Sequence, residues 1–305
     1  MQSKPFEVIM STPIVDFAAN VARLRQLYSG HPASATSMWS REYIASGIDP
    51  ANFRADNVYV WQRFHGNDAY ERSYRWLADH EGDLLAGCSE DGAFGAHCVP
   101  IDGRLVSRDL LDSVAELGFL RSELGDLSSL SFLDIGAGYG RLAHRTSEVA
   151  PGAGYICSDG IPESTALSEF YLAHRGVETV DVVPLNDIAS RLSSTRIDVA
   201  LNIHSFPECP SPAIEWWLRL LADHEVRYLF IVPNEVGLLR GTDGARLELM
   251  PLLNRFGYRL EAMRLKYRDR RFADTDWVFQ MSHCLFVRSP APVLTGGQFQ
   301  QVEGY

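Results

Sequence analysis

The chain has 305 residues and a formal net charge of −11, and 46% of its residues are hydrophobic while 22% are charged. This composition is ordinary for a globular protein with a sizeable core, and it excludes a chain that is mainly disordered. The negative charge argues against general binding to nucleic acid or to an anionic membrane, because both need a positive field. The sequence has no run of apolar residues long enough to span a membrane.

The N-terminal residues and the cysteines bear on the cellular compartment. The first ten residues, MQSKPFEVIM, lack the apolar stretch and the small-residue cleavage site of a signal peptide. The five cysteines are odd in number and none belongs to a C-x-x-C motif, which argues against a disulfide framework and against a zinc finger. We therefore predict a cytoplasmic protein whose thiols are reduced.

The first part of the chain is predicted to be mostly helical. Apolar residues recur at helical spacing over 15–28, 68–80 and 107–124, and Ser107 is placed to cap the last of these helices. The stretch 82–103 is rich in Gly, Cys, Ser and Asp and is interpreted as a loop or an irregular hairpin. We interpret residues 1–127 as a mainly helical N-terminal cap that shapes the acceptor region.

From residue 130 on, short apolar runs alternate with helical segments. The runs are 131–135, 155–157, 180–183, 198–203 and 228–232, and the helices begin near Gly140, Pro162, Asn186 and Pro212. This alternation predicts right-handed βαβ units and a parallel sheet, so the fold class is α/β. The runs 258–267 and 278–287 have no helix between them and predict a terminal antiparallel hairpin. The sheet domain is assigned to 128–289, followed by a tail at 290–305.

The segment 132–141, FLDIGAGYGR, places an acid and three glycines between a strand and a helix. A tight turn after a buried strand lets a ligand approach the backbone closely, which only glycine permits. A dinucleotide fingerprint, G-x-G-x-x-G, would need glycine where Arg141 stands. The pattern here is D-x-G-x-G-x-G, beginning at Asp134. An acid near the loop suits a ligand with a cationic amino-acid part better than it suits a pyrophosphate.

This loop resembles motif I of the class I S-adenosylmethionine-dependent methyltransferases. The resemblance implies a Rossmann-like, seven-stranded methyltransferase sheet with S-adenosylmethionine as cofactor. Asp159 ends the second strand and is implied to accept the ribose hydroxyls, although a dehydrogenase shares this feature. The cofactor-binding residues that the resemblance implies are Asp134, Gly136, Ala137, Gly138, Asp159, Gly160, Asn186 and Asn202.

A narrower resemblance is to bacterial sugar O-methyltransferases. It rests on YVWQR at 59–63, GYGRL at 138–142 and NIHSF at 202–206. It implies methyl transfer to a hydroxyl of a sugar or oligosaccharide, such as a methylmannoside in polysaccharide biosynthesis. The implied partners are a small-molecule or oligosaccharide acceptor and a second copy of the chain in a homodimer, with no nucleic acid and no membrane.

Methyl transfer to a hydroxyl needs collinear reacting atoms and a base that removes the proton. Histidine is a common base, and two histidines are suitably placed in the sequence. His144 lies four residues after Gly140, on the first turns of the loop helix, and is our first candidate. His204 follows the fourth strand, at the end that points into the cleft, and is the second.

The acceptor site is predicted from aromatic and polar residues. Sugar C–H faces pack well on aromatic rings, so Tyr59 and Trp61 in a candidate lid, with Arg63, are assigned to the acceptor together with Glu208. The aromatic residues of the following helix, Tyr70, Tyr74 and Trp76, also fit the apolar face of a cap helix.

A divalent cation is a further possibility at the strand ends. Glu208, Asn234 and Glu235 offer oxygen ligands that suit Mg²⁺. Acids on surface loops explain these three residues more simply, so no residue is assigned to a metal site.

Two other functions remain open from the sequence. One is an NAD(P)-dependent oxidoreductase. Two observations argue against it: Arg141 stands where the dinucleotide fingerprint has glycine, and no Tyr-x-x-x-Lys or Ser catalytic set is evident. The other is a protein that binds S-adenosylmethionine without turnover, because a fold does not by itself imply catalysis.

Overall fold

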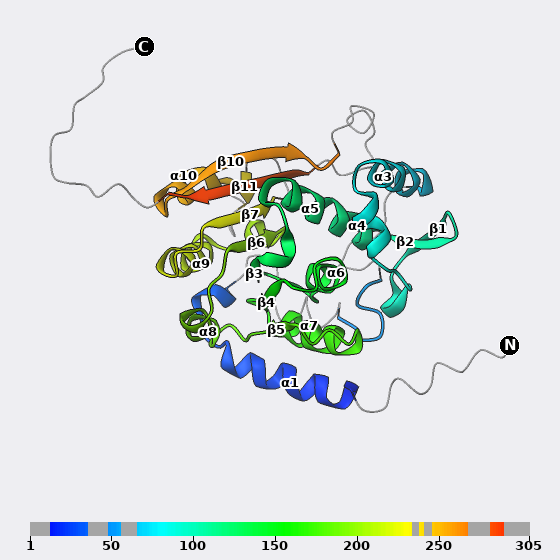
Figure 1. The fold of residues 1–305 in the computed structure, drawn as a ribbon. Coiled ribbons are helices and arrows are strands. Elements are labelled where there is room, and N and C mark those ends of the chain that lie inside the picture. Colours follow the sequence, from blue (N-terminus) through cyan, green and yellow to red (C-terminus); the bar gives the residue numbers. More distant parts are fainter. Residues whose placement is uncertain are drawn as a thin grey trace, which may run out of the picture.

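The computed structural model describes residues 13–35, 48–55, 66–233, 238–240, 246–267 and 281–289. A seven-stranded sheet forms its centre (Figure 1). In spatial order the strands are β10 (Tyr258–Leu265), β11 (Ser282–Arg288), β7 (Tyr228–Val232), β6 (Val199–Ile203), β3 (Ser131–Ile135), β4 (Gly154–Ser158) and β5 (Val180–Val182). The five strands from β7 to β5 are parallel, whereas β11 lies antiparallel between β7 and β10.

The apolar runs of the sequence form this sheet as predicted. Strands such as β3 and β7 are buried along all but their first residue, because helices cover both faces, and such strands read as continuous apolar runs. The α/β class, the Rossmann-like seven-stranded sheet and the terminal antiparallel hairpin are therefore confirmed. The hairpin does not simply extend the sheet, since its second strand, β11, returns to pair with β7.

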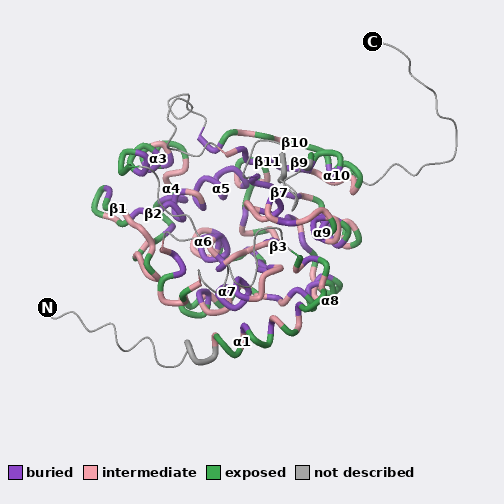
Figure 2. Tube along the Cα trace, turned by 180° about the vertical axis from the view of Figure 1, so that it is seen from behind, coloured by how far each residue is buried: buried purple, intermediate pink, exposed green. Residues whose placement is uncertain are grey.

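Helices cover the two faces of the sheet. The helices are α1 (Pro13–Leu27), α3 (Asn67–His80), α4 (Gly82–Gly87), α5 (Arg108–Leu124), α6 (Arg141–Val149), α7 (Pro162–His174), α8 (Ile188–Ser194), α9 (Ser211–Asp223) and α10 (Leu249–Arg255). Helices α3 to α7 share one hydrophobic cluster with one face, and α8 to α10 share a second cluster with the other. Helix α1 joins the second cluster and lies beside α7 (Figure 1). Buried residues follow the strands and the inward faces of these helices (Figure 2).

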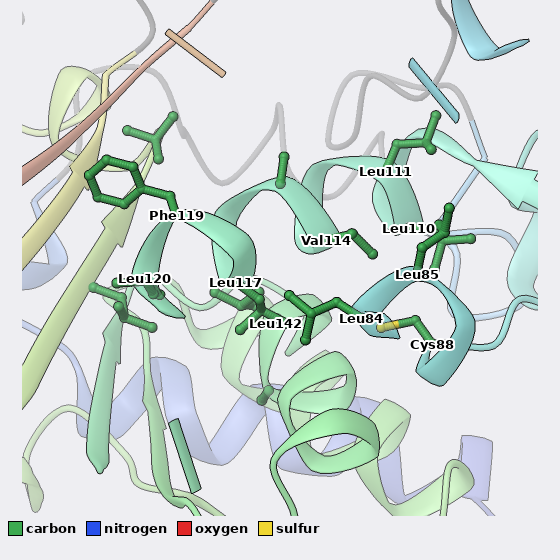
Figure 3. Close-up of a cluster of buried hydrophobic side chains, with 14 of the residues drawn as sticks. Leu84, Leu85, Cys88, Leu110, Leu111, Val114, Leu117, Phe119, Leu120 and Leu142 are labelled. Carbon is green, nitrogen blue, oxygen red and sulfur yellow. The ribbon is translucent and has the colours of Figure 1, made fainter. Parts of the chain in front are cut away.

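Helix α5 belongs to the sequence range of the predicted cap, yet it packs on the sheet. Phe119 lies 5.4 Å from Phe230 of β7, measured between ring centroids. Figure 3 shows leucines of α5 meeting α4 on one side and Leu142 of α6 on the other. Ser107 caps α5 as predicted, because its hydroxyl accepts the Leu110 N–H at 3.1 Å. Helices α4, α5 and α6 therefore form one layer over this face of the sheet.

The stretch 82–103 contains more regular structure than expected. A hairpin does form, from β1 (Cys98–Ile101) and β2 (Arg104–Ser107), but its second strand lies beyond the stretch, and residues Gly82–Gly87 form α4 rather than a loop. The helix forms because Leu84 and Leu85 bury against α5, which outweighs the weak helix preference of its two glycines. Among the short elements that were not predicted are α10, β8 (Leu238–Arg240) and β9 (Arg246–Glu248).

All five cysteines are free, and Cys157 and Cys284 are buried in strands as small apolar residues. Within the ranges described above, no helix is both long and apolar enough to cross a membrane.

Candidate functional site

The glycine loop joins β3 to α6 at the carboxyl end of the sheet. Gly136, Gly138 and Gly140 all have positive φ, at 75°, 60° and 85°, which is a conformation that only glycine adopts readily. The Gly136 N–H donates to the Ser158 carbonyl at 2.9 Å, so the loop is held against the end of β4. A Cβ atom at Gly136 would overlap the side chain of Ser205, in the loop after β6. Three strand ends therefore converge on this loop.

Asp159 connects the second strand end to the glycine loop. One carboxyl oxygen accepts the Gly138 N–H at 3.0 Å and the other accepts the Ile161 N–H at 2.8 Å. Burial raises the pKa of Asp159 to about 7, and the nearby charges of Glu208 and Asp134 act in the same direction. A buried acid of this kind favours a ligand that donates hydrogen bonds or carries positive charge.

Asp134 lies at the base of the loop. It is 3% exposed and accepts a hydrogen bond of 2.9 Å from the Tyr155 hydroxyl. Burial raises the pKa of its carboxyl to about 6. Asp134, Asp159 and Glu208 together make the surroundings of the glycine loop acidic, which disfavours a pyrophosphate.

The raised pKa of Asp159 makes ligand binding depend on pH. We expect an adenosine ligand whose ribose hydroxyls donate to Asp159 to bind about tenfold more weakly at about pH 6 than at about pH 8, because protonation removes the acceptor charge. Calorimetry at the two pH values measures the change. Asp159→Asn should bind weakly with no such pH dependence, whereas the same slope in that variant would assign the proton to another group.

The other predicted cofactor residues have different roles. Asn202 is fully buried and uses its side-chain amide to join two backbone segments: it donates to the Ile135 carbonyl at 3.0 Å and accepts the Phe206 N–H at 2.9 Å. It holds the loop after β6 against the end of β3, so its contacts there are with the protein itself. Ala137 lies in the glycine loop, and Asn186 is exposed on the loop after β5. Gly160 lies against the backbone of Ala33.

His204 stands at the carboxyl end of β6, as expected. Its backbone has φ of +63°, which is uncommon for a residue with a side chain, and its N–H donates to the Val232 carbonyl at 2.9 Å. Strained backbone of this kind clusters at functional sites. Burial lowers the pKa of the ring to about 3, so His204 is neutral at physiological pH.

His144 does not have the environment that we predicted. Its Nδ1 lies 2.9 Å from the Tyr171 hydroxyl of α7, and its Nε2 lies 3.7 Å from a carboxyl oxygen of Glu148. The ring is 6% exposed, and burial lowers its pKa to about 3. Four residues after Gly140, the helix turns this side chain toward α7. The packing accounts for His144 structurally and leaves His204 as the better candidate for a base.

A polar cluster on α5 was missed by the sequence reasoning. Arg141 donates to both carboxyl oxygens of Glu116, at 2.9 and 3.0 Å, and to the Ser113 hydroxyl at 2.7 Å. One turn earlier, Asp112 bonds Lys266, and the charges of Asp112 and Lys266 both act on His204. Arg141, where a dinucleotide fingerprint has glycine, thus ties the glycine loop to α5. The signal in the sequence that could have predicted this cluster was the presence of acidic residues in the otherwise apolar helix α5.

A second missed network holds the loop from behind. Tyr139, between two loop glycines, bonds Asp109 through its hydroxyl. Arg54 is fully buried and donates to the same carboxylate at 3.3 Å and to Glu90 at 2.7 Å. Its neighbour Phe53 packs on the Tyr139 ring at 5.2 Å. The segment 48–55 is therefore fastened directly to the glycine loop.

Replacing Arg54 with methionine should lower the free energy of unfolding by about 3 to 5 kcal/mol, because it leaves two buried carboxylates without their shared cation. Urea unfolding measures this loss. Arg75→Met is the matched control, since Arg75 pairs with Asp102 on the exposed surface and should change stability little. Equal losses in the two variants would contradict the importance of the buried network.

The predicted acceptor residues Tyr59, Trp61 and Arg63 fall outside the described ranges, and so do Asn234 and Glu235, which were considered as ligands of a divalent cation. Tyr70 and Tyr74 are buried in the core of the cap layer, and Trp76 stacks on His80 with ring centroids 4.2 Å apart. Glu208 lies in a short 3-10 helix after β6, close enough for its charge to act on Asp159. Among the residues described, no group of His, Cys, Asp and Glu is arranged to hold a metal ion.

Comparisons with known proteins found similarity at the level of solved structures. No family model and no curated protein matches the sequence. A SAM-dependent methyltransferase from Aquifex aeolicus is 16% identical, with 56% of this chain and 88% of that chain covered and a TM-score of 0.42. Magnesium protoporphyrin IX methyltransferase from Synechocystis PCC 6803, solved with bound SAM, is 12% identical over 74% of this chain and 100% of that one, with a TM-score of 0.42. Precorrin-6y C5,15-methyltransferase from Geobacter metallireducens is 13% identical over 59% and 88%, with a TM-score of 0.40.

Proposed function

We propose that the protein is an S-adenosylmethionine-dependent O-methyltransferase that methylates a hydroxyl of a sugar or oligosaccharide. The observation that carries the proposal is the glycine loop, hydrogen-bonded to Asp159 across the ends of β3 and β4. The sheet that presents this loop has seven strands, with antiparallel β11 inserted between β7 and the edge strand β10, whereas the dinucleotide-binding sheet has six strands in the order 3-2-1-4-5-6. Arg141 further separates this loop from the dinucleotide fingerprint.

The residues at the loop fit the chemical groups of this cofactor. Each carboxylate oxygen of Asp159 accepts one backbone N–H and retains capacity for a second hydrogen bond, which suits two ribose hydroxyls. The glycines let a ligand approach the backbone between Gly136 and Gly138. The acids Asp134 and Glu208 favour the cationic amino-acid part. When bound, S-adenosylmethionine supplies a methyl group activated by the positive sulfur.

His204 is proposed as the base. The acceptor oxygen forms a bond to the methyl carbon as the carbon–sulfur bond breaks, and the hydroxyl proton passes to the neutral imidazole of His204. As the hydroxyl oxygen gains the methyl group, its proton becomes more acidic than that of an imidazolium with a low pKa. Even a weakly basic imidazole therefore accepts this proton. Ser205, the next residue in the chain, packs against Gly136 of the glycine loop. His204 is therefore adjacent in the chain to a residue that contacts this loop.

A sugar acceptor is supported by the type of residue at the site. A neutral hydroxyl requires a base and polar groups for orientation, which we assign to His204 and Glu208. Tyr59, Trp61 and Arg63 are proposed to complete the acceptor site from the preceding segment. A homodimer and a cytoplasmic location are retained as part of the proposal.

Two measurements test the function in sequence. Calorimetry with S-adenosylmethionine and with NAD⁺ separates the proposed cofactor from that of an oxidoreductase; binding of NAD⁺ alone would overturn the proposal. Transfer of a labelled methyl group to a panel of neutral mono- and oligosaccharides then tests the acceptor. Binding of S-adenosylmethionine without transfer to any saccharide would reject the sugar assignment and favour a different acceptor or a binding protein.

A further inference from the structure

Helix α1 and the segment that follows it reach the carboxyl end of the sheet. The helix is fastened to α7 by polar contacts along its length: Asn20 bonds Glu169, and Arg25 donates to Glu163 at 2.6 Å. Its last turn brings Tyr28 into the core, where the ring is 2% exposed. Tyr28, the residue that directly follows α1, thus places its hydroxyl group beside the loops after β4 and β5.

The Tyr28 hydroxyl joins those two loops through a directional chain of hydrogen bonds. It accepts the Leu185 N–H at 2.9 Å, in the loop after β5. Thr165 donates its own proton to the Ile161 carbonyl at 3.3 Å, so its oxygen is left to accept the Tyr28 proton at 3.0 Å. The chain therefore ends at Ile161, in the loop after β4, and Ile161 in turn donates its N–H to Asp159.

The backbone beyond Tyr28 closes on the same place. A short 3-10 helix, Pro32–Ser34, brings the Ala33 carbonyl so near to Gly160 that a Cβ atom there would overlap it. His31 supports this turn by accepting the Ala33 N–H at 3.2 Å and by packing edge-on against Trp216 of α9 at 4.6 Å. Gly160 is therefore the residue against which this segment packs, and it directly follows Asp159 in the chain.

We propose that Tyr28 is a positioning residue for the adenosine part of the cofactor, an inference that rests on the proposed function. If Asp159 holds the ribose, the amino-acid part lies toward the glycine loop. The adenine ring then lies on the other side of the ribose, against the loops after β4 and β5, because β5 is the next strand of the sheet. Tyr28 sets the distance between these loops because it bonds Leu185 directly and reaches Ile161 through Thr165 of α7, and it does so from outside the site.

The test uses the full-length protein with Tyr28→Phe, which keeps the ring and removes only the hydroxyl. Tyr258→Phe is the matched control, because Tyr258 is also fully buried in the same hydrophobic cluster and its hydroxyl bonds the Val226 carbonyl at 2.8 Å. Titration with S-adenosylhomocysteine and with 5′-methylthioadenosine, which lacks the amino-acid part, measures both affinities. Tyr28→Phe should weaken both ligands by about tenfold, while Tyr258→Phe stays within about twofold of the wild type.

Amide hydrogen exchange provides a readout that needs no ligand. The Leu185 amide should exchange faster in Tyr28→Phe than in the wild type or in Tyr258→Phe, because its acceptor is lost. A lowered Tm in Tyr28→Phe with unchanged affinity for 5′-methylthioadenosine would make Tyr28 merely structural and overturn the inference while the proposed function stands. Failure of the wild type to bind either ligand would overturn the proposed function, and this inference with it.

Discussion

Replacing Gly136 with alanine is expected to abolish binding of S-adenosylmethionine, with an affinity loss of more than about 100-fold. The backbone there has φ of 75°, which costs a residue with a side chain about 1–2 kcal/mol. The larger effect is steric, because the new methyl group would overlap the side chain of Ser205 and force the glycine loop away from the loop after β6. Calorimetry measures the loss of binding, and thermal unfolding shows whether the fold survives.

Two further variants separate the backbone cost from the collision. Gly176 also has a positive φ, of 67°, but has open space around it, so Gly176→Ala reports backbone strain alone and should leave binding unchanged. In the double variant Gly136→Ala, Ser205→Gly the overlapping atoms are gone, and part of the affinity should return. If Gly136→Ala binds S-adenosylmethionine as tightly as Gly176→Ala does, the contact between the glycine loop and the loop after β6 is not required for cofactor binding.

Replacing His204 with alanine should slow methyl transfer by about 100- to 10,000-fold, which is the usual contribution of a positioned general base. Affinity for the cofactor should change only a few-fold, because the loop contacts of Gly136 and Asp159 remain. The measurement is turnover with a saccharide that the wild type methylates. Because burial keeps the pKa of His204 near 3, the ring is already neutral at about pH 5, and its own titration should not shape the rate between about pH 5 and about pH 8.

His144→Ala is the counterpart of that experiment. His144 contacts Tyr171 and Glu148 in the packing between α6 and α7, so its loss should lower Tm while turnover of the folded protein stays near that of the wild type. The opposite pattern, slow turnover in His144→Ala and normal turnover in His204→Ala, would return the role of base to His144.

Local features of the sequence predicted the fold because each depends on near neighbours. The run 131–135 and its glycine loop specify a buried strand followed by a turn that only glycine can make, and both occur as expected. Ser107 caps α5 for the same reason, since a cap needs only the next three residues. Where neighbours compete, local signals fail: the glycines at the ends of α4 suggested a loop, but Leu84 and Leu85 bury against α5 and impose a helix.

The contacts between distant parts of the chain depend on how the whole fold packs. The spacing of Gly140 and His144 predicts a shared helix but not which neighbour that helix packs against, and it is α7 that supplies Tyr171 as the partner of His144. Tyr28 and Leu185 are 157 residues apart, and Arg54 meets Asp109 across 55. The succession of strands along the chain, the glycine turn and the acids beside it could be predicted from the sequence, because they follow from residue type and short-range periodicity. The packing of buried polar groups is settled only when the whole fold brings each donor to an acceptor, and for that reason the partners of Arg54, Tyr28 and His144 emerge only from the folded chain.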